Sequence, residues 1–367
     1  MSDIFFSFNG REIEIVSSYV YLGVTMSSST WFRMQMEKAK LKAKRVLQMV
    51  LKLIFKTRLA NFHGHYTLFE SIIKSTLLYG CSVWAHRYKE KPEPVQNIYY
   101  RRLLGLHPQL SSAVVRCETA SQFLEISVWE QTINFIRKIK IMDNKRYAKL
   151  IFDRLVLLDA PSLDYNWVTQ VRRGLTSFGL GDFITLNPEE YLTYCAAAHE
   201  VIVEPFREHD EYLTARLYDY PQYSQLFVYE KREQIGTTEA NKESRRWPKL
   251  PWYLRTELSL QIKRIIAQLR QGGVHIMCNG TVVSIPHKKE DAKCSFCSLD
   301  DRNCPQHAMF ECPITAVTAL TLQRHGWKPS KFMECLDVPW KDPHEVHKLL
   351  MQCVEMRKLM CAEASTH

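Results

Sequence analysis

The sequence predicts a mainly α-helical protein that begins with a small β-hairpin and ends in a helical domain containing a cluster of cysteines. Apolar residues recur at helical spacing through most of the 367 residues. Two short strand-like segments flank Asn9-Gly10 near the N-terminus, and four cysteines gather between residues 294 and 312. With 46% hydrophobic residues, the chain can bury a sizeable core.

Residues 1–27 form the predicted β part. The apolar run 4–8 and the alternating segment 12–16 lie on either side of Asn9-Gly10, a pair suited to the two positive φ angles of a type I′ turn. A further strand is expected over residues 18–24, which are rich in tyrosine and valine.

Residues 30–59 are predicted to form a long amphipathic helix with one cationic face. Between Arg33 and Arg58 there are nine basic residues and one acidic residue, Glu37. A surface that binds successive phosphates of a nucleic-acid backbone explains this imbalance of charge. A solvated helix with a nuclear-localisation-like segment at 38–45 also explains it. The candidate nucleic-acid-binding residues on this helix are Lys38, Lys42, Arg45 and Lys52.

Further helices are expected on both sides of a weakly patterned region. Proline and glycine punctuate them, for example at Pro92, Gly105 and Pro108. Residues 159–241 are expected to hold short helices and loops. The expected helices are 65–87, 94–104, 112–120, 127–158 with a break near residue 143, 251–271, 315–325 and 345–360, and a two-stranded turn is expected at 274–285.

The cysteine cluster carries the strongest chemical signal in the chain. Cys294, Cys297, His307 and Cys312 supply four ligands of the types that zinc prefers, and the Cys-x-x-Cys pair lets one turn present two thiolates. Cys304 is a fifth candidate that would replace His307, but the His-x4-Cys spacing favours His307. The sequence therefore predicts a structural zinc in a knuckle spanning 294–312. Such knuckles contact nucleic acid or clip protein partners.

The formal net charge of +10 favours an anionic partner. Arg245, Arg246 and Trp247 combine cations with an aromatic face, as binders of single-stranded nucleic acid do. Trp252-Tyr253 follows nearby, and core packing explains these aromatic residues equally well. Trp84 and Trp129 lie on apolar helical stripes, where a core role is expected.

No catalytic site is expected. Asp300-Asp301 superficially resembles a polymerase metal-binding pair but lies inside the proposed zinc loop, so an acidic surface turn is the preferred interpretation. No run reaches the roughly 18 to 20 apolar residues of a membrane span. Together with the mostly scattered cysteines, this predicts a protein of the nucleus or cytoplasm that acts without a membrane.

Several segments, taken in order, resemble the region downstream of the catalytic palm in LINE-type (non-LTR) retrotransposon reverse transcriptases. Tyr21-Leu22-Gly23 is similar to the family's Tyr-Leu-Gly motif, where a β-turn grips the primer strand. The segments 73–85 and 95–105 resemble the thumb signature and the helix after it. The match continues at 117–119, 268–270 and 279–280 and through the knuckle to Pro313.

The resemblance implies a remnant of the palm and primer grip at 1–27 and a thumb-like helical domain at 28–158. A connecting region at 159–241 and a C-terminal domain at 242–367 follow. It implies binding of RNA or single-stranded DNA, with Arg101 and Arg102 on the helix after the thumb signature as further contacts. The family's endonuclease, fingers and palm aspartates are absent, so no polymerase activity is expected of this chain. A domesticated or decayed remnant acting as a zinc-containing protein-interaction scaffold is the alternative.

Overall fold

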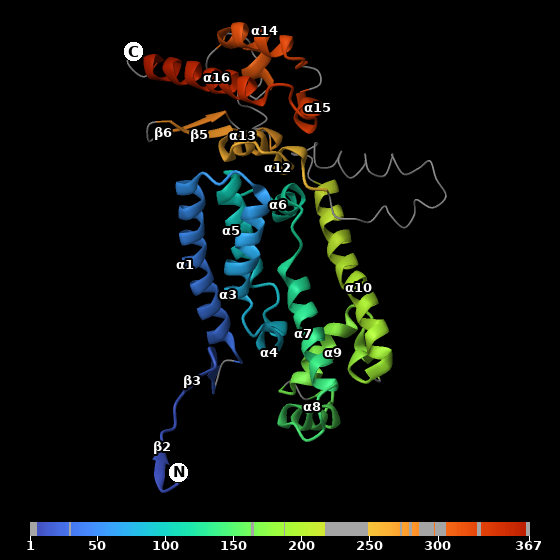
Figure 1. The fold of residues 1–367 in the computed structure, drawn as a ribbon. Coiled ribbons are helices and arrows are strands. Elements are labelled where there is room, and N and C mark those ends of the chain that lie inside the picture. Colours follow the sequence, from blue (N-terminus) through green and yellow to red (C-terminus); the bar gives the residue numbers. More distant parts are fainter. Residues whose placement is uncertain are drawn as a thin grey trace, which may run out of the picture. The chain divides into compact units, whose positions relative to one another are not determined.

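The computed structural model describes residues 6–28, 31–162, 165–186, 188–216, 249–271, 274–278, 281–285, 297, 306–328 and 332–364. The protein is mainly helical with a small N-terminal hairpin, which confirms the predicted fold class (Figure 1). Its residues divide into two compact units, each drawn from three stretches of the chain. The first unit comprises Met1–Val46, Ile72–Val95 and Leu124–Ile202, and the second comprises Leu47–Ser71, Gln96–Phe123 and Val203–His367. The predicted thumb-like segment 28–158 contributes to both.

The first unit begins with the predicted hairpin. Strand β1 (Phe6–Phe8) pairs antiparallel with β2 (Arg11–Ile13), placing Phe8 opposite Arg11. Asn9 has a φ of 50° and Gly10 a φ of 73°, the left-handed conformations that a type I′ turn requires. The prediction from Asn9-Gly10 is therefore confirmed.

A second hairpin follows where the sequence predicted a single strand. Strands β3 (Ser18–Tyr21) and β4 (Val24–Ser27) pair antiparallel, and the chain reverses at Leu22, with a φ of 46°, and Gly23, with a φ of 81°. A leucine at positive φ is uncommon, so the apolar run concealed the turn. Tyr79 supports this turn, because its hydroxyl donates to the Leu22 carbonyl oxygen over 3.2 Å.

Helix α1 (Arg33–Thr57) confirms the predicted long helix, with Ala39, Ala43, Val50 and Ile54 buried on one stripe. The prediction of one helix at 65–87 was wrong. The chain instead forms α2 (Phe62–Leu68), the π-helical turn η1 (Phe69–Lys74), α3 (Ser75–Leu77), α4 (Cys81–Trp84) and η2 (Ala85–Arg87). Gly80, with a φ of 64°, interrupts the helical path before α4.

In the rest of the first unit, Trp129 of α7 is fully buried. The predicted break near residue 143 is confirmed, since α7 (Leu124–Lys140) ends before α8 (Tyr147–Leu157) begins. Helix α9 (Trp167–Thr176) and the 3-10 turn η3 (Gly181–Ile184) follow. Trp84 is also buried, so the core roles predicted for both tryptophans are confirmed.

Short helices and loops were expected between 159 and 241; α9 and η3 agree with this, whereas helix α10 (Pro188–Ala215) corrects it. It is 28 residues long and continues through Pro205. A proline inside a helix removes one backbone hydrogen bond and usually ends or kinks it, which is why the sequence favoured a break. The buried residues Ala198, Ile202, Val203 and Asp210 on this helix show the packing that stabilises it.

The second unit contains further helices and one hairpin. Helices α5 (Glu93–Leu104) and α6 (Ser112–Thr119) agree with the predicted boundaries. The predicted helix 251–271 is divided into α12 (Trp252–Arg255) and α13 (Leu260–Arg270). Strands β5 (Val274–Cys278) and β6 (Thr281–Ile285) pair as predicted. The C-terminal elements are the π-helical turn η5 (His307–Glu311), the 3-10 turn η6 (Pro313–Thr315), α14 (Ala316–Arg324), α15 (Phe332–Asp337) and α16 (Pro343–Ala364).

Aromatic residues fill much of the core of the second unit. The rings of Phe69, Tyr99 and Tyr100 lie 5.1–5.5 Å apart and are fully buried. Near the C-terminus, Trp252, Trp327 and Trp340 pack together. Among the described residues, no helix is both long and apolar enough to cross a membrane.

Candidate metal centre and cationic surfaces

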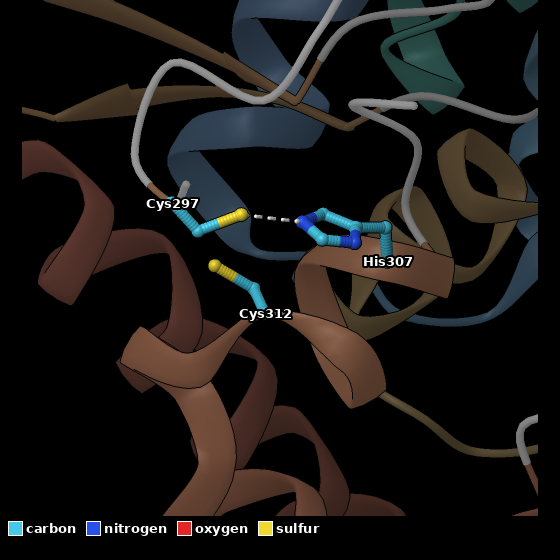
Figure 2. A group of neighbouring side chains, drawn as sticks. All are labelled: Cys297, His307 and Cys312. Atoms are coloured by element: carbon cyan, nitrogen blue, oxygen red, sulfur yellow. Dashed lines mark hydrogen bonds between the residues drawn. The ribbon is translucent and has the colours of Figure 1, made fainter. Parts of the chain in front are cut away.

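Cys297, His307 and Cys312 form a compact group in the second unit, with their side chains directed toward one another (Figure 2). Their ligand atoms all lie within 4.8 Å of one another. The Cys297 Sγ is 3.4 Å from His307 Nε2. Two ligands of one tetrahedral zinc, a sulfur at about 2.3 Å and a nitrogen at about 2.0 Å, are separated by about 3.5 Å. The observed spacing therefore fits ligands of a common ion.

Local backbone structure holds two of these ligands in place. His307 begins η5, and Cys312 follows directly after it, with the Cys312 amide donating to the His307 carbonyl over 2.8 Å. The Thr315 amide and hydroxyl both donate to the Cys312 carbonyl oxygen, at 3.0 and 3.1 Å. This tight turn brings a His-x4-Cys pair onto one side of the chain. The four-residue spacing in the sequence thus places the His307 and Cys312 side chains close enough to bind one ion.

The site lies against an apolar interior. His307 and Cys312 are each 1% exposed. Phe310, which lies between them in the sequence, stacks on the ring of Trp327. The Glu311 carboxylate lies 3.7 Å from His307 Nδ1, on the ring nitrogen opposite Nε2. This separation is longer than a hydrogen bond, so Glu311 lies near the ring without bonding to it. The arrangement is suited to a structural ion enclosed by protein.

One predicted ligand and the alternative fifth candidate lie outside the described residues. Cys294, the first cysteine of the Cys-x-x-Cys pair, is one, and Cys304, the alternative to His307, is the other. The acidic pair Asp300-Asp301 also lies outside them. The structure therefore brings together three of the four predicted ligands.

The predicted cationic residues of α1 lie on its solvent-exposed face. Lys38, Lys42, Arg45 and Lys52 are all exposed and follow one another at helical spacing. The Lys38 ammonium donates to the Thr25 hydroxyl over 3.3 Å. In the part of the chain that the structure describes, none of these four side chains forms an ion pair. Their positive charge is therefore uncompensated within this part of the protein.

Lys38 and Lys42 line a pocket of about 580 Å³ in the first unit, beside the second hairpin. The hairpin contributes Val20, Gly23 and Thr25 to it. Gly23 is needed at this position because a Cβ there would lie 3.2 Å from the Tyr79 ring, and because its φ is positive. The Tyr-Leu-Gly turn thus lies next to two of the predicted cations.

Arg101 and Arg102 lie near the end of α5 in the second unit. The Arg101 guanidinium donates to the Leu110 carbonyl over 2.6 Å and to the Ser112 hydroxyl over 3.3 Å. Arg102 is exposed. The other predicted contacts, Arg245, Arg246 and Trp247, lie outside the described residues.

The sequence did not single out Phe55 and Arg264, which share a pocket with Lys52, Arg101 and Arg102. Arg264 lies 5.4 Å from the centre of the Phe55 ring. No local sequence signal links them, because they lie on helices far apart in the sequence. By contrast, Trp252 and Tyr253 are buried at 8% and 0% exposure, so of the two interpretations, core packing holds for them.

Fold and site together describe a mainly helical protein with a Cys/His group that could hold a metal. No known protein family, curated protein or solved structure matches the chain.

Proposed function

We propose that this chain is the C-terminal, nucleic-acid-binding portion of a protein similar to LINE-type reverse transcriptases. It binds RNA or single-stranded DNA through backbone electrostatics and has no polymerase site of its own. A structural zinc ion, held by Cys297, His307 and Cys312 with Cys294 as fourth ligand, organises its C-terminal part.

The observation that carries this proposal is the uncompensated charge on α1. Lys38, Lys42 and Arg45 are exposed and have no ion-pair partner in the described part of the chain. Lysine and arginine that neutralise phosphates release condensed counterions, and this release drives binding to nucleic acid. The order of the sequence motifs points to the same ligand.

The zinc proposal rests on the spacing and burial of its ligands. A bound ion would tie Cys297 to the turn that carries His307 and Cys312, which are 1% exposed. In such closed sites the metal contributes to folding. The turn from His307 to Cys312 positions one thiolate beside the imidazole.

A salt titration of RNA binding with a matched set of variants tests the proposal. Lys38→Gln, Lys42→Gln and Arg45→Gln combined remove three positive charges from α1. Lys145→Gln, Arg146→Gln and Arg154→Gln combined remove three exposed charges at and before α8. We expect the slope of log K against log salt for single-stranded RNA to become shallower by about 2 in the first variant only, at about 0.7 per phosphate contact. Equal slopes in both variants would contradict the role given to α1.

A further inference from the structure

The second unit contains a cationic pocket of about 720 Å³ formed by three helices. Helix α1 contributes Lys52 and Phe55, α5 contributes Arg101 and Arg102, and α13 contributes Arg264. The remaining lining residues are Gln48, Leu51, Ile98, Gly105, Leu106, Pro108 and Gln268. Four cations thus surround the space, and the lining includes no acidic residue.

The charges of this pocket are not neutralised from within. In the described part of the chain, Lys52, Arg101, Arg102 and Arg264 form no ion pair. Burial lowers the pKa of Arg264, and burial together with the neighbouring Arg116 lowers the pKa of Arg101. Partly desolvated cations without counter-charges attract an anion strongly, since water screens them less than it screens surface charges.

Two of the guanidinium groups are held in place before any ligand arrives. Arg101 is fixed by its bonds to the Leu110 carbonyl and the Ser112 hydroxyl. Arg264 lies over Phe55 and beside Gly105. Donors that are already ordered lose less entropy on binding a phosphate.

Gly105 allows this arrangement. It has a φ of 67°, and a Cβ there would lie 2.5 Å from Gln268 Nε2 and 2.9 Å from Arg264 Nη2. Without that Cβ, Gln268 can donate to the Gly105 carbonyl oxygen over 2.9 Å. Gly105 also ends α5, where the Leu106 amide donates to the Arg101 carbonyl over 2.8 Å. One glycine therefore ends the helix and leaves room for the side chains of α13.

Phe55 adds a stacking surface to the cationic pocket. Its side chain is 41% exposed, and an exposed phenylalanine beside arginines is typical of sites where nucleic-acid bases stack. A base pair within a duplex offers no free face to such a ring, whereas an unpaired base does. The pocket chemistry thus combines a phosphate-binding part with a base-binding part.

We propose that this pocket binds one phosphorylated nucleotide unit of a single strand, with the phosphate at Arg101, Arg102 and Arg264 and the base against Phe55. This inference rests on the proposed function, because it assigns a single-strand-specific subsite to a protein that binds nucleic acid. Lys52 faces the same pocket and contacts the adjoining phosphate.

Binding of fluorescent hexauridylate, which does not pair with itself, tests the subsite. Phe55→Leu removes the ring and keeps an apolar side chain, and Arg264→Gln removes one charge. We expect each variant to bind hexauridylate about tenfold more weakly at low salt, with a longer, stably paired RNA duplex unaffected. The controls are Leu53→Ala on the exposed surface of α1 and Arg255→Gln on α12, which do not line the pocket.

The outcomes separate this inference from the proposed function. If the wild-type protein binds hexauridylate tightly and both pocket variants bind it equally well, the subsite is wrong and the general nucleic-acid function stands. If both variants lose affinity for duplex and single strand equally, the pocket is a general phosphate site and the single-strand assignment is wrong. If the wild-type protein binds neither, both proposals fail. Matching thermal unfolding midpoints of the variants establish that any loss of affinity arises at the pocket.

Discussion

Arg116 and Asp210 form a two-point ion pair inside the second compact unit. The Arg116 Nε lies 2.7 Å from Asp210 Oδ2, and Nη2 lies 2.6 Å from Oδ1. Their side chains are only 3% and 1% exposed, and the Phe123 ring lies 3.6 Å from the guanidinium. The pair joins α6 to α10, two helices far apart in the sequence.

Neutralising one partner of this pair is expected to be costly. Asp210→Asn leaves a buried guanidinium without its counter-charge, so the free energy of unfolding should fall by about 3–5 kcal/mol. Asp153→Asn is the control, since its pair with Lys149 is partly exposed and is worth about 0.5 kcal/mol. Urea denaturation of both variants measures the difference. Equal losses would show that burial of the Arg116 pair has no special role.

Replacing Gly174 with alanine is expected to destabilise the protein, which is the opposite of the usual effect of this change inside a helix. Replacing a glycine inside a helix with alanine usually stabilises the protein by up to about 1 kcal/mol. In α9, however, a Cβ at Gly174 would lie 2.1 Å from the Trp129 ring, which is fully buried. Gly174→Ala should therefore destabilise the protein by about 1–3 kcal/mol.

Gly64→Ala in α2 is the matched control for this change. The nearest atom to its Cβ would be Leu59 Cδ2 at 3.4 Å, an ordinary contact. This variant should be as stable as the wild type or more so in thermal unfolding. If Gly174→Ala proved the more stable of the two, the close packing of α9 on α7 would be wrong.

The buried His86 is expected to make the folded protein less stable in mild acid. Burial and the neighbouring Arg87 lower its pKa from 6.5 to about 4. The unfolded chain therefore takes up a proton on this side chain below about pH 6.5, while the folded protein resists it until about pH 4. Stability is present above this window and is lost as the pH falls through it. The contribution between about pH 7 and pH 5 is about 2 kcal/mol.

The test compares urea unfolding of the wild type and of His86→Gln at these two pH values. The variant should lose less stability on acidification, by about 2 kcal/mol. His63→Gln replaces an exposed histidine and should follow the wild type. If His86→Gln kept the wild-type acid sensitivity, another group would carry it.

Much of the fold could be predicted from local patterns. Asn9-Gly10 gave the correct turn because its two residues tolerate positive φ. The buried stripe of α1 followed from its apolar spacing. Leu22 misled, since positive φ at leucine depends on the tertiary contact with Tyr79 rather than on local preference. Pro205 misled for the same kind of reason, because packing of α10 overrides the break that proline favours.

The candidate sites were predictable to different degrees. Cys297, His307 and Cys312 stand out because metal ligation needs particular residue types at short spacing. Lys52, Arg101 and Arg102 were predicted as separate nucleic-acid contacts. Phe55 and Arg264 were not, because the pocket joins residues of three helices that only the folded chain brings together.

The metal centre predicts stoichiometric zinc in the purified protein. Cys297→Ser combined with Cys312→Ser should reduce the zinc content from about one ion per chain to near zero, because two thiolates are lost. Cys335→Ser, a change at a half-buried cysteine of α15, should retain the metal. Elemental analysis after dialysis provides the measurement. Full zinc content in the double variant would exclude this centre.

The proposed function requires that the protein bind nucleic acid through its phosphates. The most direct measurement is the affinity of the purified protein for single-stranded RNA, with polyglutamate of matched charge as competitor. We expect RNA to bind far more tightly than polyglutamate, and its affinity to fall by about 100-fold between about 50 and about 200 mM salt for about five phosphate contacts. RNA affinity that does not exceed that of polyglutamate, or that stays flat over this salt range, would contradict the account.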